Sequence, residues 1–249
     1  MSLSSHELAN RAAQIDWYHR LELPGGVITA GKADTRKALR RLRLPESLAG
    51  KTVLDIGTWD GFYAFECARR GAERVLATDS FAWSGECWGT KDGFDLARDA
   101  LGLQGVVNDQ AIDVMDLTPE QIGGQFDVVL LLGVLYHLTD PIRAMERAAS
   151  CSREWLYIET ETAMNWFPFE AARLHPGATL NNDPTNWYQF NVKALRGILA
   201  GLGFGSIRVA YHSPMHRRAA RAVTMARNGQ HFLPHLRSSR IVLHARRTD

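Results

Sequence analysis

Short apolar runs recur along most of the chain and alternate with segments whose apolar residues have helical spacing. The runs predict strands at Val53–Ile56, Val75–Ala77, Val106–Ile112, Phe126–Leu132, Trp155–Glu159, Ser206–Tyr211 and Ile241–His244. The run Phe126–Leu132 is almost entirely apolar, as expected of a strand that is covered by helices on both faces. Strands that alternate with helices in this way predict an α/β fold built on a doubly wound parallel sheet.

Two segments depart from this rhythm. Ser4 and Glu7 form a capping-box pattern, which predicts a helix over about 5–19, and a short basic helix is expected near 34–43. We assign residues 1–45 to an N-terminal helical cap and residues 46–249 to the main domain. Within that domain, residues 160–190 are rich in aromatic side chains and prolines, and this composition favours an aromatic lid over a regular element.

The most informative stretch lies between residues 51 and 79, where a strand, a glycine turn, a helix and a second strand follow each other. Gly57 closes the first strand, and Gly61 lets the helix approach that strand closely. Asp79 ends the second strand about 20 residues beyond Gly57, the spacing at which an acid meets ribose hydroxyls in nucleotide-binding units. Asp79 is therefore a candidate ribose ligand, with a capping role in its turn as the alternative.

The residues between the two glycines indicate which nucleotide this turn can hold. Thr58, Trp59 and Asp60 stand where a dinucleotide fingerprint has its middle glycine. An indole and a carboxylate would crowd and repel a pyrophosphate at the helix N-terminus. A nucleoside without phosphates and with a cationic sulfonium fits better, and S-adenosylmethionine is such a ligand. A unit that binds no nucleotide is the alternative.

Composition and charge narrow the class of protein further. The chain has 249 residues, of which 45% are hydrophobic and 22% charged, as is usual for a globular domain. No apolar stretch is long enough for a membrane span, the start lacks the apolar core of a secretory signal, and three scattered cysteines predict neither a disulfide framework nor a zinc site. We therefore expect a cytoplasmic protein without a membrane partner.

The net charge is only +2, but basic residues are clustered. Nine arginines lie between residues 201 and 249, and a second basic cluster lies between residues 32 and 43. This distribution is typical of a protein with an anionic partner, such as RNA or an anionic substrate, and equally of solvated helix faces.

Two strings of residues resemble class I S-adenosylmethionine-dependent methyltransferases. They are Val-Leu-Asp-Ile-Gly-Thr-Trp-Asp-Gly-Phe-Tyr at 53–63 and Phe-Asp-Val-Val-Leu-Leu-Leu-Gly-Val-Leu-Tyr-His-Leu-Thr-Asp-Pro at 126–141. More narrowly, the string 133–137 and the segment 240–247 are similar to the bacterial tRNA wobble-uridine carboxymethyltransferase subfamily and its shorter relatives. The resemblance covers roughly residues 50–249.

That resemblance implies a seven-stranded Rossmann-like sheet with strand order 3-2-1-4-5-7-6 and an antiparallel strand seven. It also implies cofactor contacts at Gly57, Asp79, Ser80, Phe81, Asp113, Val114, Met115 and Leu132. In the tRNA enzyme, the tyrosine of the Val-Leu-Tyr-His string and the arginine that opens the last strand hold the extra carboxylate of carboxy-S-adenosylmethionine. Their counterparts are Tyr136 and Arg240, and the nearest candidates for that enzyme's N-terminal lysine are His19 and Arg20.

Other residues of the turn and its neighbourhood are further candidate cofactor contacts. Asp113 has the position of the acid that accepts the adenine amino group, and Asp116 competes with it for this role. Asp55 either holds the turn backbone or binds the cofactor's amino group. The remaining candidates are Thr58, Trp59 and Gly61 of the turn, and the aromatic rings of Trp59 and Trp83 either close over the cofactor or only pack.

The candidate catalytic residues are Tyr136, His137 and Arg240. Methyl transfer is an in-line displacement at a carbon that the sulfonium already activates, so neither a metal nor a covalent intermediate is needed. Tyr136 either orients the substrate or packs beneath the lid, and His137 is either a general base or structural. Candidate substrate contacts are Trp166, Trp187, Tyr188 and Arg240, of which the three aromatic residues would form walls.

Three functions remain open from the sequence. The favoured function is methyl transfer from S-adenosylmethionine to a small molecule, because the cofactor signature is combined with an aromatic lid. The second is a tRNA (carboxy)methyltransferase, to which the basic clusters, Tyr136 and Arg240 point. The third is a cofactor-binding partner protein without catalytic activity.

Overall fold

The computed structural model describes residues 3–86, 88–229 and 231–248, so Cys87 lies outside the described residues. The chain divides into two compact units, residues 1–130 and 131–249, which are described separately below. The assignment of residues 1–45 to a cap and 46–249 to a main domain stays a prediction.

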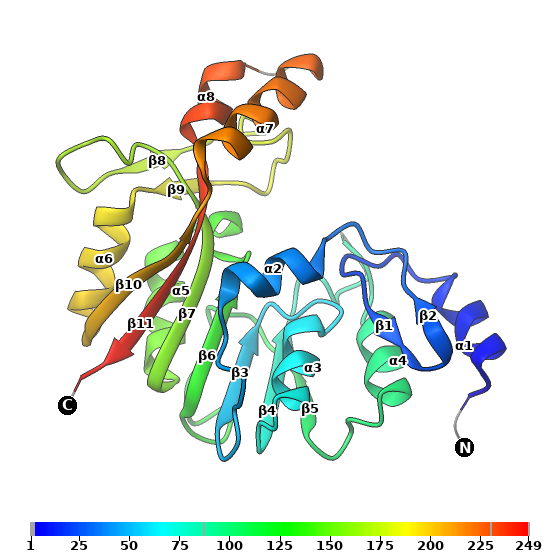
Figure 1. Ribbon diagram of the computed structural model, residues 1–249. Coiled ribbons are helices and arrows are strands. Elements are labelled where there is room, and N and C mark those ends of the chain that lie inside the picture. The colour runs from blue at the N-terminus through cyan, green and yellow to red at the C-terminus, as the bar shows by residue number, and fades with distance from the viewer. Residues whose placement is uncertain (1–2, 87, 230, 249) are drawn as a thin grey trace. The chain divides into compact units, whose positions relative to one another are not determined.

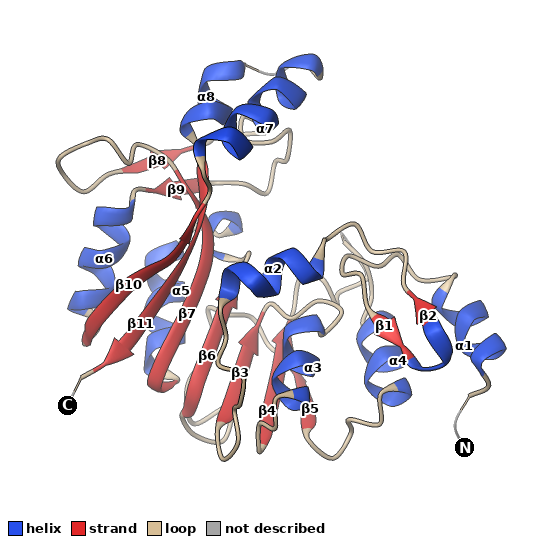
Figure 2. Ribbon diagram, in the orientation of Figure 1, coloured by secondary structure: helices blue, strands red, loops and turns tan. Residues whose placement is uncertain are grey.

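Seven strands follow one another in the sheet in the order β10-β11-β7-β6-β3-β4-β5 (Figure 2). If these seven strands are renumbered 1 to 7 in chain order, the order read from β5 to β10 is 3-2-1-4-5-7-6, as predicted. The predicted Rossmann-like α/β fold is therefore confirmed. The last strand, β11, is antiparallel to both β10 and β7, as predicted. The strands are β3 (Thr52–Ile56), β4 (Arg74–Asp79), β5 (Val107–Ala111), β6 (Phe126–Leu132), β7 (Ser152–Thr162), β10 (Phe204–His212) and β11 (Ser239–Arg247).

The core of the first unit forms where apolar strands meet two helices. Strands β3, β4 and β5 run parallel, with Val53 opposite Val75 and Val75 opposite Val107. All three valines are fully buried. Helices α3 (Phe62–Arg69) and α4 (Asp92–Ala100) add Phe65 and Phe94, whose rings lie 5.3 Å apart. Burial of these side chains holds the carboxyl ends of the strands in fixed positions.

The N-terminal segment differs from its prediction in helix length. The capping box of Ser4 and Glu7 is present, but α1 spans only Ser5–Ala12 rather than 5–19. The Trp17 indole donates a hydrogen bond to the carbonyl of Ala12 (2.8 Å), which would otherwise accept from the next helical turn. Beyond it lie β1 (Glu22–Leu23), the turn η1 (Pro24–Gly26), β2 (Val27–Ile28) and the expected basic helix α2 (Thr35–Leu42).

The second unit is built on β7, β11 and β10, which Figure 1 shows as long neighbouring arrows. Its helices are η2 (Leu135–His137), α5 (Pro141–Ser150) and α6 (Val192–Gly201), and the Asn191 side chain caps α6. The arginine-rich stretch forms α7 (Met215–Arg227) and α8 (Phe232–Arg237), which pack against each other (Figure 1).

The expectation that residues 160–190 contain no regular element is wrong at both ends of that segment. Strand β7 continues to Thr162, three residues beyond the predicted end at Glu159. Two short strands, β8 (Ala172–Leu174) and β9 (Tyr188–Phe190), pair with each other, and Phe190 lies opposite Thr162 of β7. Aromatic residues of this segment thus lie in strands as well as in loops, and amino-acid composition alone does not distinguish a strand from a loop here.

None of the helices in the described part of the chain has the length and apolar character that crossing a membrane requires.

The close approach at Gly61 predicts a specific stability loss. Gly61 has a φ of 84°, and an added Cβ would lie 2.7 Å from Phe94 and still closer to the Phe65 ring. Gly61→Ala should therefore lower the free energy of unfolding through two effects, the positive φ and the steric clash. The clash should add about 1–3 kcal/mol to the loss that the positive φ causes by itself. Urea denaturation measures this. The matched control is Gly102→Ala, because Gly102 has a φ of 67° with nothing within 4 Å. Equal losses in the two variants would contradict the steric argument.

Candidate functional site

The turn after β3 is tied to the end of the neighbouring strand β4. The backbone N–H groups of Gly57 and Thr58 donate to the carbonyl of Thr78, over 2.8 and 3.1 Å. The Thr58 hydroxyl donates to the Asp55 carboxylate (2.7 Å), which is almost fully buried. In this structure Asp55 therefore holds the turn, which was one of its two predicted roles.

Asp79 places its carboxylate against the same turn. One oxygen, Oδ2, accepts the N–H of Trp59 (2.9 Å), and Oδ1 accepts the N–H of Ala82 (2.9 Å). Each carboxylate oxygen can accept more than one hydrogen bond, so these caps leave capacity for hydroxyl donors. The structure thus shows the capping role of Asp79, and its binding of ribose stays a prediction.

A second contact joins the end of β4 to the loop after β5. The Ser80 hydroxyl donates to Asp113 (3.0 Å), whose other oxygen accepts the N–H of Met115 (2.9 Å). Val114 is buried beneath this loop, whereas Phe81 is 44% exposed. Candidate cofactor residues from two loops are thereby brought together within the first unit.

Burial raises the pKa of several acids of this unit, and their charges on one another add to the shifts. Burial raises the pKa of Asp55 to about 7 and that of Asp60 to about 6, and the charge of Asp79 adds to both shifts. Burial also raises the pKa of Asp79 itself, to which the charge of Asp113 contributes, although backbone N–H groups oppose the rise. The turn is therefore an electronegative site, in which a cationic ligand would relieve repulsion between carboxylates.

Trp59 is sandwiched between two other aromatic rings. Its indole stacks on Tyr18 at 4.3 Å and on Trp88 at 5.1 Å, both nearly parallel. The Trp83 indole donates to the carbonyl of Trp59 (2.8 Å), and its ring packs against Phe94. Of the two alternatives left open for Trp59 and Trp83, the packed one is what the structure shows.

Asp60 fixes the segment that supplies Tyr18. Its Oδ2 accepts the backbone N–H groups of both Tyr18 and His19, each over 2.8 Å. Burial lowers the pKa of His19 to about 3, so this ring is neutral at physiological pH. His19 therefore lacks the positive charge of the lysine for which it was a candidate counterpart.

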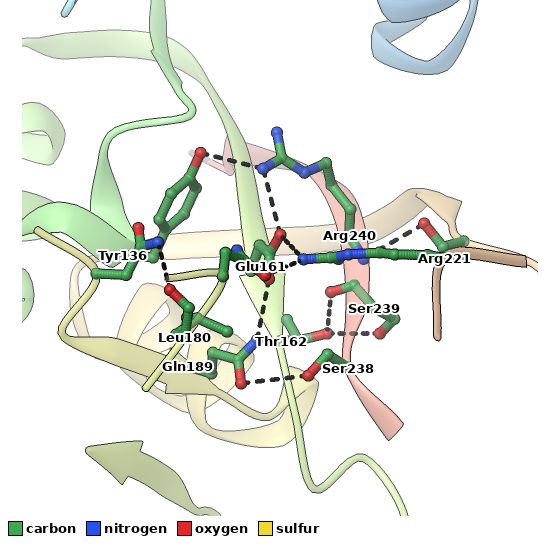
Figure 3. Close-up of polar contacts among 12 residues, drawn as sticks. Tyr136, Glu161, Thr162, Leu180, Gln189, Arg221, Ser238, Ser239 and Arg240 are labelled. Carbon is green, nitrogen blue, oxygen red and sulfur yellow. Dashed lines mark hydrogen bonds and ion pairs between the residues drawn. The ribbon is translucent and has the colours of Figure 1, made fainter. Parts of the chain in front are cut away.

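In the second unit, Arg240 contacts Tyr136 and Glu161, as Figure 3 shows, and it also contacts Glu159. Its guanidinium contacts the carboxylate of Glu159 (3.1 Å), the carboxylate of Glu161 (3.4 Å) and the hydroxyl of Tyr136 (3.1 Å). The guanidinium also lies 5.4 Å from the centre of the Tyr136 ring. The predicted pair Tyr136 and Arg240 is thus brought together, but the charge of Arg240 is already balanced.

Glu161 is the buried centre of this network and is only 2% exposed. It accepts hydrogen bonds from Arg221 (2.8 Å) and from the side-chain amide of Gln189 (3.1 Å), as Figure 3 shows. Burial acts to raise the pKa of Glu161, but the charges of Arg221 and Arg240 outweigh it and the pKa is lowered. A buried carboxylate with two guanidinium partners fixes the positions of both arginines.

His137 lies beside Tyr136 and contacts the loop before β9. Its Nδ1 lies 2.8 Å from the hydroxyl of Thr185, and its ring centre lies 4.3 Å from that of Tyr136. Burial lowers the pKa of His137 to about 4, so the ring is neutral at physiological pH. Leu132, the last residue of β6, precedes Gly133, whose N–H donates to the carbonyl of Glu159 (2.9 Å).

The three aromatic residues predicted to form walls of a substrate site lie in different surroundings. The backbone N–H of Trp187 donates to the carbonyl of Tyr136 (2.7 Å), which places this residue beside the candidate catalytic pair. Tyr188 stacks on Phe190 at 6.2 Å within β9. Trp166 is 54% exposed and has the Arg237 guanidinium 5.3 Å above its ring. Of the three, Trp187 is thus the one whose backbone is bonded to a candidate catalytic residue, and the role of all three as substrate walls stays a prediction.

Most of the C-terminal arginines have partners inside their own unit. Arg208 contacts His244, Arg218 donates to the carbonyl of Leu236, and Arg246 pairs with Glu154. Seven of the nine are engaged in this way or over an aromatic ring, namely Arg208, Arg218, Arg221, Arg237, Arg240, Arg246 and Arg247. Most of the positively charged side chains of this region therefore make contacts within their own unit.

Several residues of these networks could not be recognised from the sequence. Asp60 was considered only as a repulsive group, although it binds backbone 41 and 42 residues away. Glu159 and Glu161 belong to a strand, where alternating acids could have indicated a polar edge facing the arginines of β11. Arg221 and Thr185 have no local pattern that would identify them.

The chain matches the family described as a methyltransferase domain over residues 30–209, which is more than half of its length, and it belongs to this family. It thus carries a S-adenosylmethionine-dependent methyltransferase domain.

Named relatives differ in their substrates. A tRNA U34 carboxymethyltransferase of Helicobacter acinonychis is 24% identical over 163 residues, which cover 66% of this chain and 59% of that protein. A ubiquinone biosynthesis O-methyltransferase of Pseudomonas paraeruginosa is 34% identical over 110 residues, 40% of either protein. The matches thus span less than two thirds of these relatives' own length.

Solved structures share the fold. The N-terminal domain of EvdMO1, crystallised in the presence of SAH and D-fucose, has a TM-score of 0.69 at 19% identity, covering 99% of this chain and 98% of that one.

The burial of Asp55 predicts a pH-dependent stability. Because its pKa is about 7 in the folded state against an ordinary value of 3.8, the folded protein binds this proton more tightly than the unfolded chain does. The contribution of Asp55 to the free energy of unfolding should fall as pH rises from about 4 to about 7, by roughly 1.4 kcal/mol per pKa unit. Asp55→Asn cannot titrate, so its stability relative to wild type should rise over this range in urea denaturation. A pH-independent difference between Asp55→Asn and wild type would contradict the assignment.

Proposed function

We propose that this protein transfers the methyl group of S-adenosylmethionine to a hydroxyl of a neutral small molecule. The observation that carries the cofactor half of this proposal is the cluster of buried acids at the turn after β3, whose pKa values are raised by burial and also by one another's charge. Asp55, Asp60 and Asp79 come together there, and Asp113 contributes from the next loop. A sulfonium nucleoside relieves this repulsion, whereas the pyrophosphate of a redox coenzyme would increase it.

Within that site, Asp79 is the proposed ligand of the ribose hydroxyls. Its carboxylate is held rigidly by two backbone N–H groups and retains acceptor capacity. Asp113 and the backbone at Val114 are proposed to bind the adenine, because the Ser80 hydroxyl fixes the orientation of that loop.

The proposal of a neutral acceptor rests on the ion pairs of the second unit, in which acidic and basic side chains balance each other. Arg240 is paired with Glu159 and Glu161, and Arg221 with Glu161. A carboxylate on the cofactor or substrate would have to displace one of these glutamates, which would cost a buried ion pair. A hydroxyl-bearing neutral acceptor can instead bond to both members of the Glu159–Arg240 pair without disturbing it.

The names of two similar proteins support a hydroxyl acceptor. One curated relative is an O-methyltransferase of ubiquinone biosynthesis, and the EvdMO1 domain was crystallised with D-fucose, a neutral sugar. In the reaction, the acceptor oxygen attacks the methyl carbon in line with the departing sulfur. The protein mainly aligns the two and excludes water.

A tRNA (carboxy)methyltransferase remains the second candidate, because several relatives carry that name and Tyr136 contacts Arg240 as the resemblance implies. Two observations weigh against it. Arg240 is already neutralised, and seven of the nine C-terminal arginines are engaged within their own unit.

Cofactor binding gives the first test. Isothermal calorimetry should show binding of S-adenosylmethionine to the wild-type chain, with the carboxylated cofactor binding no more tightly. Asp79→Asn should weaken binding about tenfold or more, because a charge-assisted hydrogen bond contributes about 1.5–3 kcal/mol. Glu73→Gln is the control and should bind normally, because this exposed carboxyl precedes β4, at the opposite end of that strand from Asp79. Unchanged affinity in a folded Asp79→Asn variant would remove the ribose assignment.

Product analysis gives the second test. The full chain is incubated with labelled S-adenosylmethionine and a panel of neutral hydroxyl compounds, beginning with D-fucose, and products are identified by mass spectrometry. We expect a mass increase of one methyl group on a hydroxyl. In parallel, bulk tRNA is tested for binding at low salt, where phosphate contacts are strongest. Salt-sensitive tRNA binding with transfer to RNA would favour the second candidate, and cofactor binding without any turnover would favour a non-catalytic partner protein.

A further inference from the structure

Helices α7 and α8 carry a large share of the exposed apolar side chains of this protein. Twelve large hydrophobic side chains are clearly exposed among the described residues, and four of them lie on these two helices, namely Met215, Val223, Phe232 and Leu233. Leu233 is 56% exposed and Val223 is 42% exposed. A single exposed apolar side chain needs no explanation, but a group of them on one element is typical of a docking surface.

Three of these four side chains lie at one end of the helix pair. Val223 is one turn before the end of α7, and Phe232 and Leu233 open α8. Helix α8 begins five residues after α7 ends, and the two helices pack side by side (Figure 1). Val223, Phe232 and Leu233 therefore come together with Arg227, the last residue of α7, and we call these four residues the hairpin tip.

A different side of α7 is fixed to the rest of the second unit. The Arg221 guanidinium reaches inward to the carboxylate of Glu161 (2.8 Å) and to Oδ1 of Asn181 (2.6 Å). Two residues correspond to about 200° around a helix, so Val223 points away from the side on which Arg221 makes these contacts. The bonds of Arg221 thus determine that the apolar side chain of α7 faces outward.

The charged side chains of the helix pair all have the same sign. Residues 215–237 contain five arginines and neither aspartate nor glutamate. Arg217, Arg227 and Arg237 are exposed. The Arg237 guanidinium lies 5.3 Å from the centre of the Trp166 ring, which is itself exposed. This surface therefore combines positive charge with apolar side chains.

That combination distinguishes between the possible occupants of the surface. A second copy of the same surface would bring arginines against arginines, which repel one another. Nucleic acid would satisfy the arginines, but its phosphates and bases offer little to the aliphatic side chains of Val223 and Leu233. A lipid surface with anionic headgroups offers phosphates to the arginines and an acyl boundary to the apolar side chains.

We propose that the hairpin tip docks this protein on an anionic membrane surface. Val223, Phe232 and Leu233 enter the boundary between headgroups and acyl chains, and Arg227 contacts lipid phosphates. The expectation of no membrane partner rested on the lack of a segment that could span a bilayer, and docking at the surface requires no such segment. This binding depends on neither the cofactor nor the acceptor of the proposed function.

Co-sedimentation of the full chain with lipid vesicles measures this docking. Two compositions are compared, phosphatidylcholine alone and phosphatidylcholine with about one third phosphatidylserine. We expect binding to the anionic vesicles that weakens as salt is raised, and little binding to the neutral vesicles. No binding to the anionic vesicles, or equal binding to both compositions, would overturn the proposal.

Matched variants assign the binding to the hairpin tip. Leu233→Ser should weaken binding to anionic vesicles about tenfold, because less apolar area leaves water. Arg227→Gln should weaken it about fivefold, the contribution of one basic residue near an anionic surface. The controls Ile142→Ser and Arg143→Gln change an exposed apolar and an exposed basic residue of α5 in the same unit, and they should bind like wild type. Circular dichroism checks that all four variants fold.

Three further outcomes would refute docking by the tip. The first is an equal loss of vesicle binding in the tip variants and in their controls. The second is binding of tRNA at low salt without binding to anionic vesicles, with the tRNA binding lost in Arg227→Gln, which would identify a nucleic-acid site. The third is a dimer in analytical ultracentrifugation that Leu233→Ser dissociates, again without vesicle binding, which would identify a second copy of the chain as the occupant.

Discussion

The hydrogen bonds between the turn after β3 and the end of β4 are the constraint on which the rest of the first unit's site depends. The Thr78 carbonyl accepts two N–H groups of the turn, and Asp79 accepts a third from Trp59. These bonds are strong because they lie in a buried environment, where an unpaired N–H would be costly. They also bring acidic side chains close together, so the geometry that stabilises the turn is the one on which the proposal of a cationic ligand rests.

The second unit contains a network of both acidic and basic side chains. There, Glu159, Glu161, Arg221 and Arg240 balance one another, and the network is closed by Tyr136 and Gln189. A balanced, rigid network suits the recognition of hydroxyl groups, since it presents donors and acceptors without a net field. The two sites therefore differ in charge: the turn after β3 concentrates acidic groups, whereas the second network pairs its two acids with two arginines.

The strands of the central sheet could be predicted from the sequence because their signal is local. Phe126–Leu132 is a continuous apolar run, and the structure has a strand with the same bounds. The acids of the cofactor site could be proposed because Gly57 and Asp79 are related by a fixed spacing. Helix α1 was predicted too long because the capping box marks only where a helix begins, whereas the contact that ends this helix comes from the Trp17 side chain. Glu161 and Arg221 are 60 residues apart, and such pairs leave no periodic signal in one sequence.

The stack of Tyr18, Trp59 and Trp88 has a practical consequence for anyone who trims this protein. The family match begins at residue 30 and ends at residue 209, so a fragment cut to those limits keeps Trp59 but removes Tyr18 from one face of its ring. The same cut removes β11 and with it Arg240. Truncation at the limits of the family match would thus damage the turn in one unit and the ion-pair network in the other, although every residue of the glycine signature would still be present.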